Sequence, residues 1–476
     1  MINELKPYAA MKDSGYPWLG EVPDHWDVLP NRALFVEIKD REHPDEEMLS
    51  VTITRGVVRQ SALLAESAKK DSSNLDRSAY KLVQPNDIAY NKMRAWQGAI
   101  GASSLRGIVS PAYVVMRPRD KSIARYFHEL FRTPMFAKEA ERWSYGITSD
   151  MWSLRSEHFK MIYSVIPPLE ERMAIVRFLS HADGQIHRYV RAKQKLIQLL
   201  DEQKQATIHR AIIRGVDPEV HLRSCGVEWL GDVPNHWQVK LLHHLLDPAI
   251  PLAYGILLPG PRLDEGVPYL GAGDVRSDRL RLDVLPRTTP EIAAAYPRTR
   301  MRAGELVYAI RGSFGSVEVI PPELDGVNLS RDAARLAPRS NVNAFWLALA
   351  LRSRLCQEQF KLKEIGATIT GVNIRDLKRV VLPVPPNEEQ AAIVRFLETE
   401  TSAVDGTIRT AEREISLLRE YRTRLVTDVV TGKLDVREAA ARLPQETPES
   451  KLDEIEDIPE DEETAAITEL EPEETV

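Results

Sequence analysis

Two segments of this chain occur twice, and these repeats constrain its architecture more than any other feature. Residues 18–28 return at 229–239, a shift of 211 positions, with eight of eleven residues identical. Residues 166–179 return at 384–397, a shift of 218, with ten of fourteen identical. The sequences between these segments barely match. Because an internal repeat indicates repeated structural units, we predict a duplicated frame that carries two divergent inserts.

Each insert combines strand and helix patterns. In the first, residues 31–165, the segment 48–54 alternates as a strand does, and 123–142 places aromatic residues on one side of a helix. The second insert, residues 240–383, contains another turn leading into a strand at 303–308. This mixture predicts an α+β fold, with two similar α+β domains in one chain.

A helical segment with an apolar seam follows each insert. The seam positions are Ile186, Val190, Lys193, Ile197 and Leu200 in the first segment, and Val404, Ile408, Ala411, Ile415 and Leu418 in the second. Alternating spacings of four and three residues are typical of a coiled coil. Since each seam is short, we expect the two helices to pack on each other as an antiparallel coiled coil, which makes the repeat pseudo-two-fold. Gly215 and Gly432 are the expected helix ends.

These patterns divide the chain into five parts. The predicted parts are residues 1–166 (first α+β domain with an N-terminal docking strip), 167–215 (first spacer helix), 216–384 (second α+β domain), 385–435 (second spacer helix) and 436–476 (an acidic tail, expected to be disordered). Residues 444–476 hold fourteen Asp/Glu and one Lys, so without them the net charge of −7 becomes +6. The body can therefore attract nucleic acid. The tail is either a solubilising end or an arm that binds a partner or mimics DNA.

The composition favours a cytoplasmic protein. Cys225 and Cys356 are the only cysteines, too few for a disulfide framework or a four-cysteine zinc site. The N-terminus has no basic region followed by an apolar run, so we expect no signal peptide. No stretch approaches about 18 uninterrupted apolar residues, so no membrane span is expected.

We found no motif that predicts catalysis by this chain. An amino-methyltransferase needs an Asn/Asp-Pro-Pro-aromatic turn, and Asp247-Pro248-Ala249-Ile250 lacks the second proline and the aromatic residue. Gly271-Ala272-Gly273-Asp274 has no third glycine, and no phosphate-binding Gly-x-x-x-x-Gly-Lys-Ser/Thr loop is present. His243 and His244 lack further ligands at metal-binding spacing. We therefore predict no catalytic residues and no metal site.

Two polar stretches at matching places in the repeat are the candidate nucleic-acid contacts. Asn and Gln can pair with adenine through two hydrogen bonds, Arg can do so with guanine, and glycines permit close approach of the backbone. The candidates are Tyr90, Asn91, Lys92, Arg94, Trp96 and Gln97 in the first half, and Tyr308, Arg311, Ser313, Asn328 and Arg331 in the second. The alternative for each stretch is a polar surface hairpin.

The same residues resemble those of a known family, the specificity (S) subunits of type I restriction–modification enzymes. The Trp-Leu-Gly-x-Val-Pro-x-His-Trp strips at 18–26 and 229–237 are similar to the start of each target-recognition domain. The Pro-Pro-x-Glu-Glu…Ile-Val-x-Phe-Leu blocks at 167–179 and 385–397 resemble the start of each spacer helix, and 85–96 resembles one family of recognition-domain cores. The resemblance covers residues 10–435; the acidic tail lies outside it.

This resemblance implies that each recognition domain reads one half of a split double-stranded DNA target. It also implies two modification subunits, which use S-adenosylmethionine to methylate adenine, and restriction subunits, which use ATP and Mg. This chain itself would bind no cofactor. Residues that either dock the modification subunits or pack the helix ends are Phe178, Leu179, Phe396 and Leu397.

We therefore interpret the chain as a non-catalytic reader of DNA sequence and an assembly scaffold. Two other hypotheses remain open. One is an enzyme with atypical methyltransferase or nuclease motifs, which would bind S-adenosylmethionine in isolation. The other is a coiled-coil protein–protein adaptor, which would show no sequence-selective DNA binding when the modification partner is present.

Overall fold

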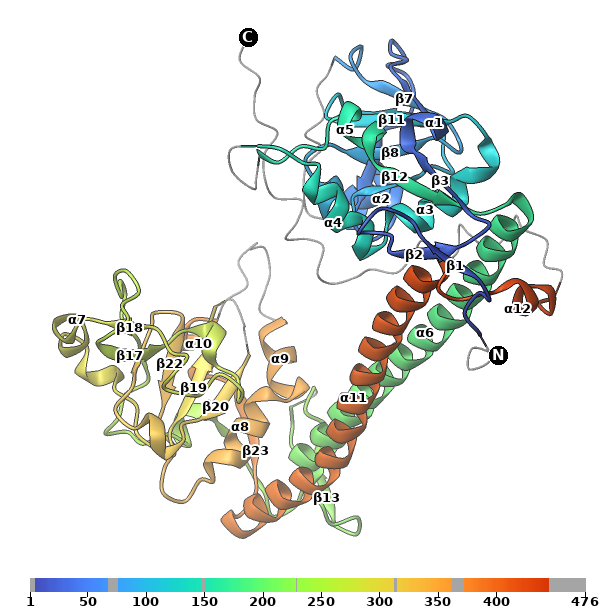
Figure 1. The fold of residues 1–476 in the computed structure, drawn as a ribbon. Coiled ribbons are helices and arrows are strands. Elements are labelled where there is room, and N and C mark those ends of the chain that lie inside the picture. Colours follow the sequence, from blue (N-terminus) through green and yellow to red (C-terminus); the bar gives the residue numbers. More distant parts are fainter. Residues whose placement is uncertain are drawn as a thin grey trace. The chain divides into compact units, whose positions relative to one another are not determined.

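The computed structural model describes residues 5–66, 76–146, 151–227, 229–311, 315–361 and 372–444. It divides into two compact units: Met1–Lys193 with Arg413–Val476, and Gln194–Glu412. Each unit contains both helices and strands (Figure 1), which confirms the mixed α and β class. The acidic tail beyond residue 444 and the predicted contact Ser313 lie outside the described residues.

The first unit is built on a four-stranded antiparallel sheet. Its order is β4 (Phe35–Ile38), β11 (Tyr113–Pro118), β8 (Ile88–Asn91) and β9 (Ile100–Ala102). A second pair joins β3 (Asp27–Pro30) to β12 (Tyr163–Ile166). The remaining elements are β1 (Met11–Asp13), β2 (Glu21–Pro23), α1 (Asn31–Leu34), β5 (Leu49–Thr52), β6 (Gly56–Arg59), α2 (Gln60–Glu66), β7 (Lys81–Val83), η2 (Ala95–Gln97), β10 (Gly107–Val109), η3 (Lys121–Ile123), α3 (Ala124–Phe131), α4 (Pro134–Arg142), α5 (Ser156–Met161) and α12 (Arg437–Ala441).

Aromatic side chains fill the core of the first unit between this sheet and its helices. Phe35 from β4 packs edge-to-face on Phe127 of α3, with ring centroids 5.1 Å apart, and Phe131 lies 5.4 Å from Phe159 of α5. All four rings are buried. Edge-to-face packing aligns the positive ring edge with the negative ring face, so the aromatic side of 123–142 anchors the helices to the sheet.

The second unit has a four-stranded antiparallel sheet of its own. Its order is β16 (Ala253–Tyr254), β22 (Ala333–Leu336), β19 (Leu306–Ala309) and β20 (Val317–Val319). Here β15 (Gln238–Leu241) pairs with β23 (Val381–Val384). The remaining elements are β13 (Leu222–Ser224), β14 (Asp232–Pro234), η5 (Leu242–His244), β17 (Val267–Leu270), η6 (Ala272–Asp274), β18 (Arg287–Thr288), α7 (Pro290–Ala294), η7 (Pro297–Thr299), η8 (Pro322–Leu324), β21 (Asn328–Leu329), α8 (Ala344–Arg352), α9 (Arg354–Lys361) and α10 (Ile374–Lys378).

The two units have the same strand pairing and the same order in their four-stranded sheets, and the second unit has a further sheet. In each, the strand that follows the Trp-Leu-Gly strip pairs with the strand just before a long helix. The order β4-β11-β8-β9 has its counterpart in β16-β22-β19-β20. The second unit adds a three-stranded sheet, β18-β17-β21, with one parallel pair.

Two long helices follow these strand pairs: α6 (Leu169–Arg214) and α11 (Asn387–Val430) (Figure 1). All ten predicted seam positions are buried or half-buried. In the first unit Lys193 lies 2.5 Å from Glu414, which explains how this seam tolerates a lysine, and Asp183 pairs with Arg422 at 2.7 Å. As the residue number increases along α6, from Asp183 to Lys193, the number of the paired residue on α11 decreases, from Arg422 to Glu414. The two segments therefore run antiparallel in this unit. The compact units divide both helices, and the five-part division of the chain stays a prediction.

A hydrogen-bonded clasp explains why the two repeated segments occur together. In the first unit His25 Nε2 lies 2.6 Å from Glu171 Oε1, and the Trp26 indole donates to Glu171 Oε2 at 2.7 Å. In the second unit His236 and Trp237 make the same contacts with Glu389, at 2.6 and 2.9 Å. The His-Trp pair of each strip therefore holds the second glutamate of the block that begins a long helix.

The glycines expected to end the helices lie against the same tryptophans. Gly215 and Gly432 both have positive φ, +78° and +77°, as expected for a helix C-terminus. A Cβ on Gly432 would lie 2.9 Å from Trp26 and 2.3 Å from Pro23, and one on Gly215 would lie 3.2 Å from Trp237. Each unit thus gathers a strip, the start of one long helix and the end of the other.

Candidate nucleic-acid interface

The first candidate stretch lies at one edge of the sheet of the first unit. Strands β4 and β8 both run antiparallel to β11, so their ends meet at the start of β11. The Lys92 amide donates to the carbonyl of Ala112 at 3.2 Å and extends this pairing by one step. The chain then turns through Arg94 into η2 and returns as β9. The predicted stretch is therefore the connection of a β-hairpin at a sheet edge.

Several of its polar groups shape this turn. The Asn91 carboxamide oxygen accepts the amide hydrogen of Met93 at 2.9 Å, and the Trp96 indole donates to the Met93 carbonyl at 2.9 Å. Trp96 also packs edge-to-face on Trp152, with centroids 5.6 Å apart. Lys92 and Arg94 are half-exposed and Gln97 is exposed. The candidates available to a ligand are therefore chiefly Lys92, Arg94 and Gln97.

The second unit presents its candidates at the corresponding edge. The amide of Ile310, just after β19, donates to the carbonyl of Asp332 at 2.9 Å, as Lys92 does to Ala112. Arg311 follows directly and is exposed. Arg331 is exposed too, and its backbone amide donates to Ile256 at 2.8 Å. Two arginines thus stand at the edge where the first unit has Lys92.

Three predicted contacts lie in the interior, so we reassign them to packing. Tyr90 and Tyr308 are 0% and 1% exposed and belong to the cores of their units. Burial raises the pKa of both phenols. Asn328 is 0% exposed, accepts from the Thr299 hydroxyl at 3.1 Å and donates to the Ala293 carbonyl at 3.3 Å. The sequence pattern predicted strands at these positions but did not show that these three side chains lie on buried faces.

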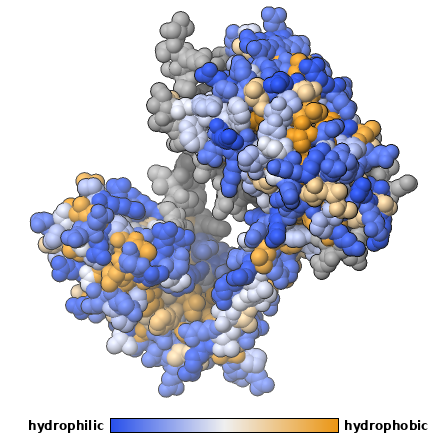
Figure 2. Space-filling model, in the orientation of Figure 1, coloured by the Kyte–Doolittle hydropathy of each residue, from blue (hydrophilic) through white to orange (hydrophobic). Residues whose placement is uncertain are grey.

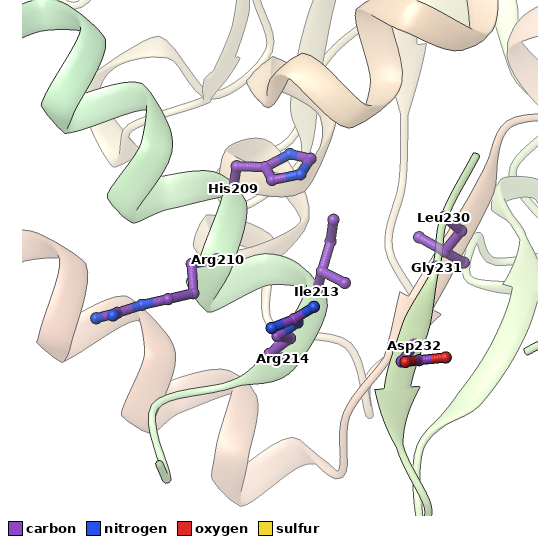
Figure 3. Close-up of a pocket in the computed structure, with 7 residues that line it drawn as sticks. All are labelled: His209, Arg210, Ile213, Arg214, Leu230, Gly231 and Asp232. Carbon is purple, nitrogen blue, oxygen red and sulfur yellow. The ribbon is translucent and has the colours of Figure 1, made fainter. Parts of the chain in front are cut away.

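The second unit also contains a pocket between the end of α6 and the second Trp-Leu-Gly strip. Its cavity of about 260 Å³ is lined by the last turns of α6 and by the turn of the second strip. Figure 3 shows His209, Arg210 and Arg214 on the helix side and Asp232 on the other. Burial lowers the pKa of His209. None of the predicted DNA contacts lines this pocket.

Comparison with known proteins shows which family this chain resembles. Residues 261–415 match the family model of the type I restriction modification DNA specificity domain. The type I restriction enzyme EcoBI specificity subunit of Escherichia coli is 22% identical over 278 residues, which cover 56% of this chain and 58% of that protein. Over these residues the chain is similar to specificity subunits of type I restriction–modification systems. Its alignment spans less than two thirds of the length of the Escherichia coli relative.

Other specificity subunits align over more of their length. The type I restriction enzyme MjaVIII specificity subunit of Methanocaldococcus jannaschii is 21% identical over 367 residues, or 75% of this chain and 81% of that protein. A structure described as showing complex assembly and conformational transition of the type I restriction–modification system superposes with a TM-score of 0.62 at 17% identity. It covers 87% of this chain and 99% of that chain, so the likeness shows a shared fold.

The four residues considered for docking pack the starts of the long helices. Phe178 and Leu179 of α6 are 4% and 1% exposed, Leu397 of α11 is 1% exposed and Phe396 is half-buried. All four join the cores of their own units. Other apolar side chains of α6 and α11 face solvent in this chain: Met173, Tyr189 and Leu417 are 65%, 60% and 53% exposed.

The sequence reasoning missed the clasp glutamates as positioning residues. Their signal was present, because His25 and Glu171 recur at the same two offsets as the blocks that contain them.

Among the described residues, no helix is long and apolar enough to cross a membrane. In that same part of the chain, no group of three or more His, Cys, Asp or Glu residues could hold a metal ion. Figure 2 shows a mainly hydrophilic visible surface on each unit, with smaller hydrophobic areas.

Proposed function

We propose that this chain is the DNA sequence-recognition subunit of a type I restriction–modification complex. It binds a bipartite, asymmetric double-stranded target, and each unit reads one half. The observation that carries the proposal is the matched sheet edge. The same backbone hydrogen bond, at Lys92 and at Ile310, is followed by the half-exposed Arg94 in the first unit and by the exposed Arg311 in the second. A shared backbone with different side chains is what two readers of different half-sites require, because base edges are distinguished by side-chain chemistry.

The frame serves as a scaffold in this proposal. We propose that α6 and α11 form an antiparallel coiled coil and that the frame is a pseudo-two-fold repeat. The reversed ion pairs of the first unit, the pair of Lys204 with Asp405 at 2.5 Å in the second, and the two clasps support this arrangement. The divergent inserts are then free to change specificity without disturbing the frame.

The chemistry would come from partner subunits. We propose that two modification subunits supply S-adenosylmethionine and adenine methylation, that restriction subunits supply ATP- and Mg-dependent translocation and cutting, and that this chain is non-catalytic and binds no cofactor itself. Since Phe178 and Leu179 are buried in the core of their unit, exposed apolar residues of the helices such as Met173 and Tyr189 are better docking candidates.

The test is sequence-selective binding by the complex of this chain with its modification partner. Randomised duplexes that survive selection should converge on two short motifs separated by a fixed, unread gap. Convergence on a single contiguous motif would contradict two readers. Retention of all duplexes alike would favour a protein–protein adaptor, and S-adenosylmethionine binding by the isolated chain would favour an enzyme.

A further inference from the structure

A buried lysine holds the turn next to the candidate interface of the first unit. Lys81 of β7 is only 8% exposed. Its ammonium donates to the carbonyl of Pro111 at 3.2 Å and to that of Tyr113. Between these two residues lies Ala112, whose carbonyl accepts the Lys92 amide. Lys81 and Lys92 therefore hold the same short turn at the start of β11.

More cations reach the same place from β4. Strand β4 ends at the edge where β11 begins, and residues 39–41 continue from it. The carbonyl of Asp40 accepts the amide of Leu82, next to Lys81, at 2.8 Å. Lys39 and Arg41, on either side of Asp40, are thereby held close to Lys81. Both side chains are exposed.

The negative charge around Lys81 does not balance these cations. The charged groups near its ammonium are Lys92, Arg41, Lys39 and Glu37. Glu37 already pairs with Lys160 at 2.9 Å and lies 3.7 Å from Lys39. Asp40 lies 2.9 Å from His43. Within the described part of the chain, no ion pair is made by Lys92 or Arg41.

Positive charge gathered in this way is unfavourable without an anion. Burial, then the charges of Lys92, Arg41 and Lys39, lower the pKa of Lys81 to about 8, and Glu37 only partly opposes them. A phosphate placed among these groups would favour the protonated form of Lys81 and relieve the repulsion between the cations. Backbone phosphates of DNA are the anions that a sheet edge facing a duplex would meet.

We propose that Lys39, Arg41 and Lys92 form a site for backbone phosphates of duplex DNA, with Lys81 as the positioning residue that holds the turn beneath it. This inference rests on the proposed function, because it assumes that the first unit meets DNA. It goes beyond that function by separating phosphate-binding residues from base readers such as Arg94 or Gln97. Phosphate contacts fix the register of a protein on DNA without reading sequence.

The experiment measures binding of fluorescent duplexes to the full chain with its modification subunits, across salt concentrations. The probes are the selected target and a random duplex. For the double variant Lys39→Gln/Arg41→Gln, losing two phosphate contacts should reduce the slope of log affinity against log salt by about 1.8. Affinity should fall by the same factor on both duplexes. The matched control is Arg119→Gln/Lys121→Gln, which removes the same charge just after the other end of β11.

The outcomes separate this inference from the proposed function. Suppose that the wild-type complex selects its target but the double variant keeps the full slope of log affinity against log salt. The proposed phosphate site is then wrong, and the proposed DNA-recognition function is unaffected. The same conclusion follows if the control variant reduces this slope as much as the double variant does. Failure of the wild-type complex to prefer any duplex would refute the reader itself.

The lowered pKa of Lys81 gives a second readout, the pH dependence of DNA affinity, which a purely structural lysine would not change. Because phosphate favours the protonated amine, wild-type affinity should fall roughly five- to tenfold between pH 7 and pH 9. The variant Lys81→Met keeps the apolar stem and should flatten this profile. A wild-type affinity independent of pH would overturn the assignment of Lys81 even if the methionine variant failed to fold.

Discussion

The clasp at Glu171 makes a quantitative prediction, because the chain contains a more exposed copy of it. The Glu171 side chain is 9% exposed and has four partners: His25, Trp26, Tyr8 and Arg437. Glu389 is 41% exposed, with His236 and Trp237 as its partners in the described residues. The same substitution, Glu to Gln, should therefore cost more in the first unit than in the second.

The size of the effect follows from the donors left without an acceptor. Glutamine keeps the shape but replaces one carboxylate oxygen with an amide that donates. At Glu171 it leaves either the His25–Arg437 pair or the Trp26–Tyr8 pair without an acceptor. A hydrogen bond to a charged group contributes about 1.5–3 kcal/mol, and Arg437 retains Asp435 at 2.6 Å. We expect Glu171→Gln to cost about 3 kcal/mol and Glu389→Gln about 1 kcal/mol, since water reaches the exposed site.

The assay is hydrogen exchange at matched backbone amides. The Trp26 amide donates to Pro23 and the Trp237 amide to Pro234, both at 3.0 Å. Glu171→Gln should speed exchange in the peptide around Trp26 by roughly a hundredfold, and Glu389→Gln should speed exchange around Trp237 by less than tenfold. Equal effects, or protection unchanged in both variants, would refute the view that the clasp glutamates hold the strips.

Three further predictions concern the glycines, the interface and the core. Gly432→Ala should lower the thermal stability of its unit by several degrees more than Gly215→Ala does, because its Cβ would lie 2.3 Å from Pro23 and both positions share the cost of positive φ; equal shifts by calorimetry would contradict this. Arg94→Ala should weaken binding to the complex's own target by about 1–3 kcal/mol if Arg94 reads a base, whereas an equal loss on random DNA would assign it to phosphate. The Tyr90 hydroxyl is buried without a hydrogen bond in the described structure. Tyr90→Phe should therefore raise the free energy of unfolding, measured by urea denaturation, by about 1 kcal/mol and leave DNA affinity unchanged. A loss of DNA binding in this variant would show that Tyr90 contributes to the interface.

The mixed helix and strand class and the long helices could be predicted from the sequence because their signature segments occur twice. A seam position such as Ile186 recurs as Val404, and burial of both matches a spacing rule that depends only on helix geometry. The repeat also identified the matching sheet edges, since Tyr90 and Tyr308 occupy the same position on corresponding strands. The resemblance to specificity subunits rested on this duplicated frame.

The candidate site was less predictable, because burial on a sheet depends on which face packs. Asn328 has the chemistry of an adenine reader, but its amide satisfies interior groups instead. Phe178 suits either a partner surface or a core, and only the packed structure assigns it to the core. Lys81 carried no signal at all, because its role depends on a turn about thirty residues away in sequence.

Mapping methylated adenine in cells that contain the modification subunits tests the central claim most directly. With this chain present, methylation should fall on one bipartite motif, and exchange of residues 31–165 for those of another family member should change one half of the motif and leave the other half and the gap intact. Methylation that persists without this chain, or an exchange that alters both halves, would contradict two independent readers on one scaffold.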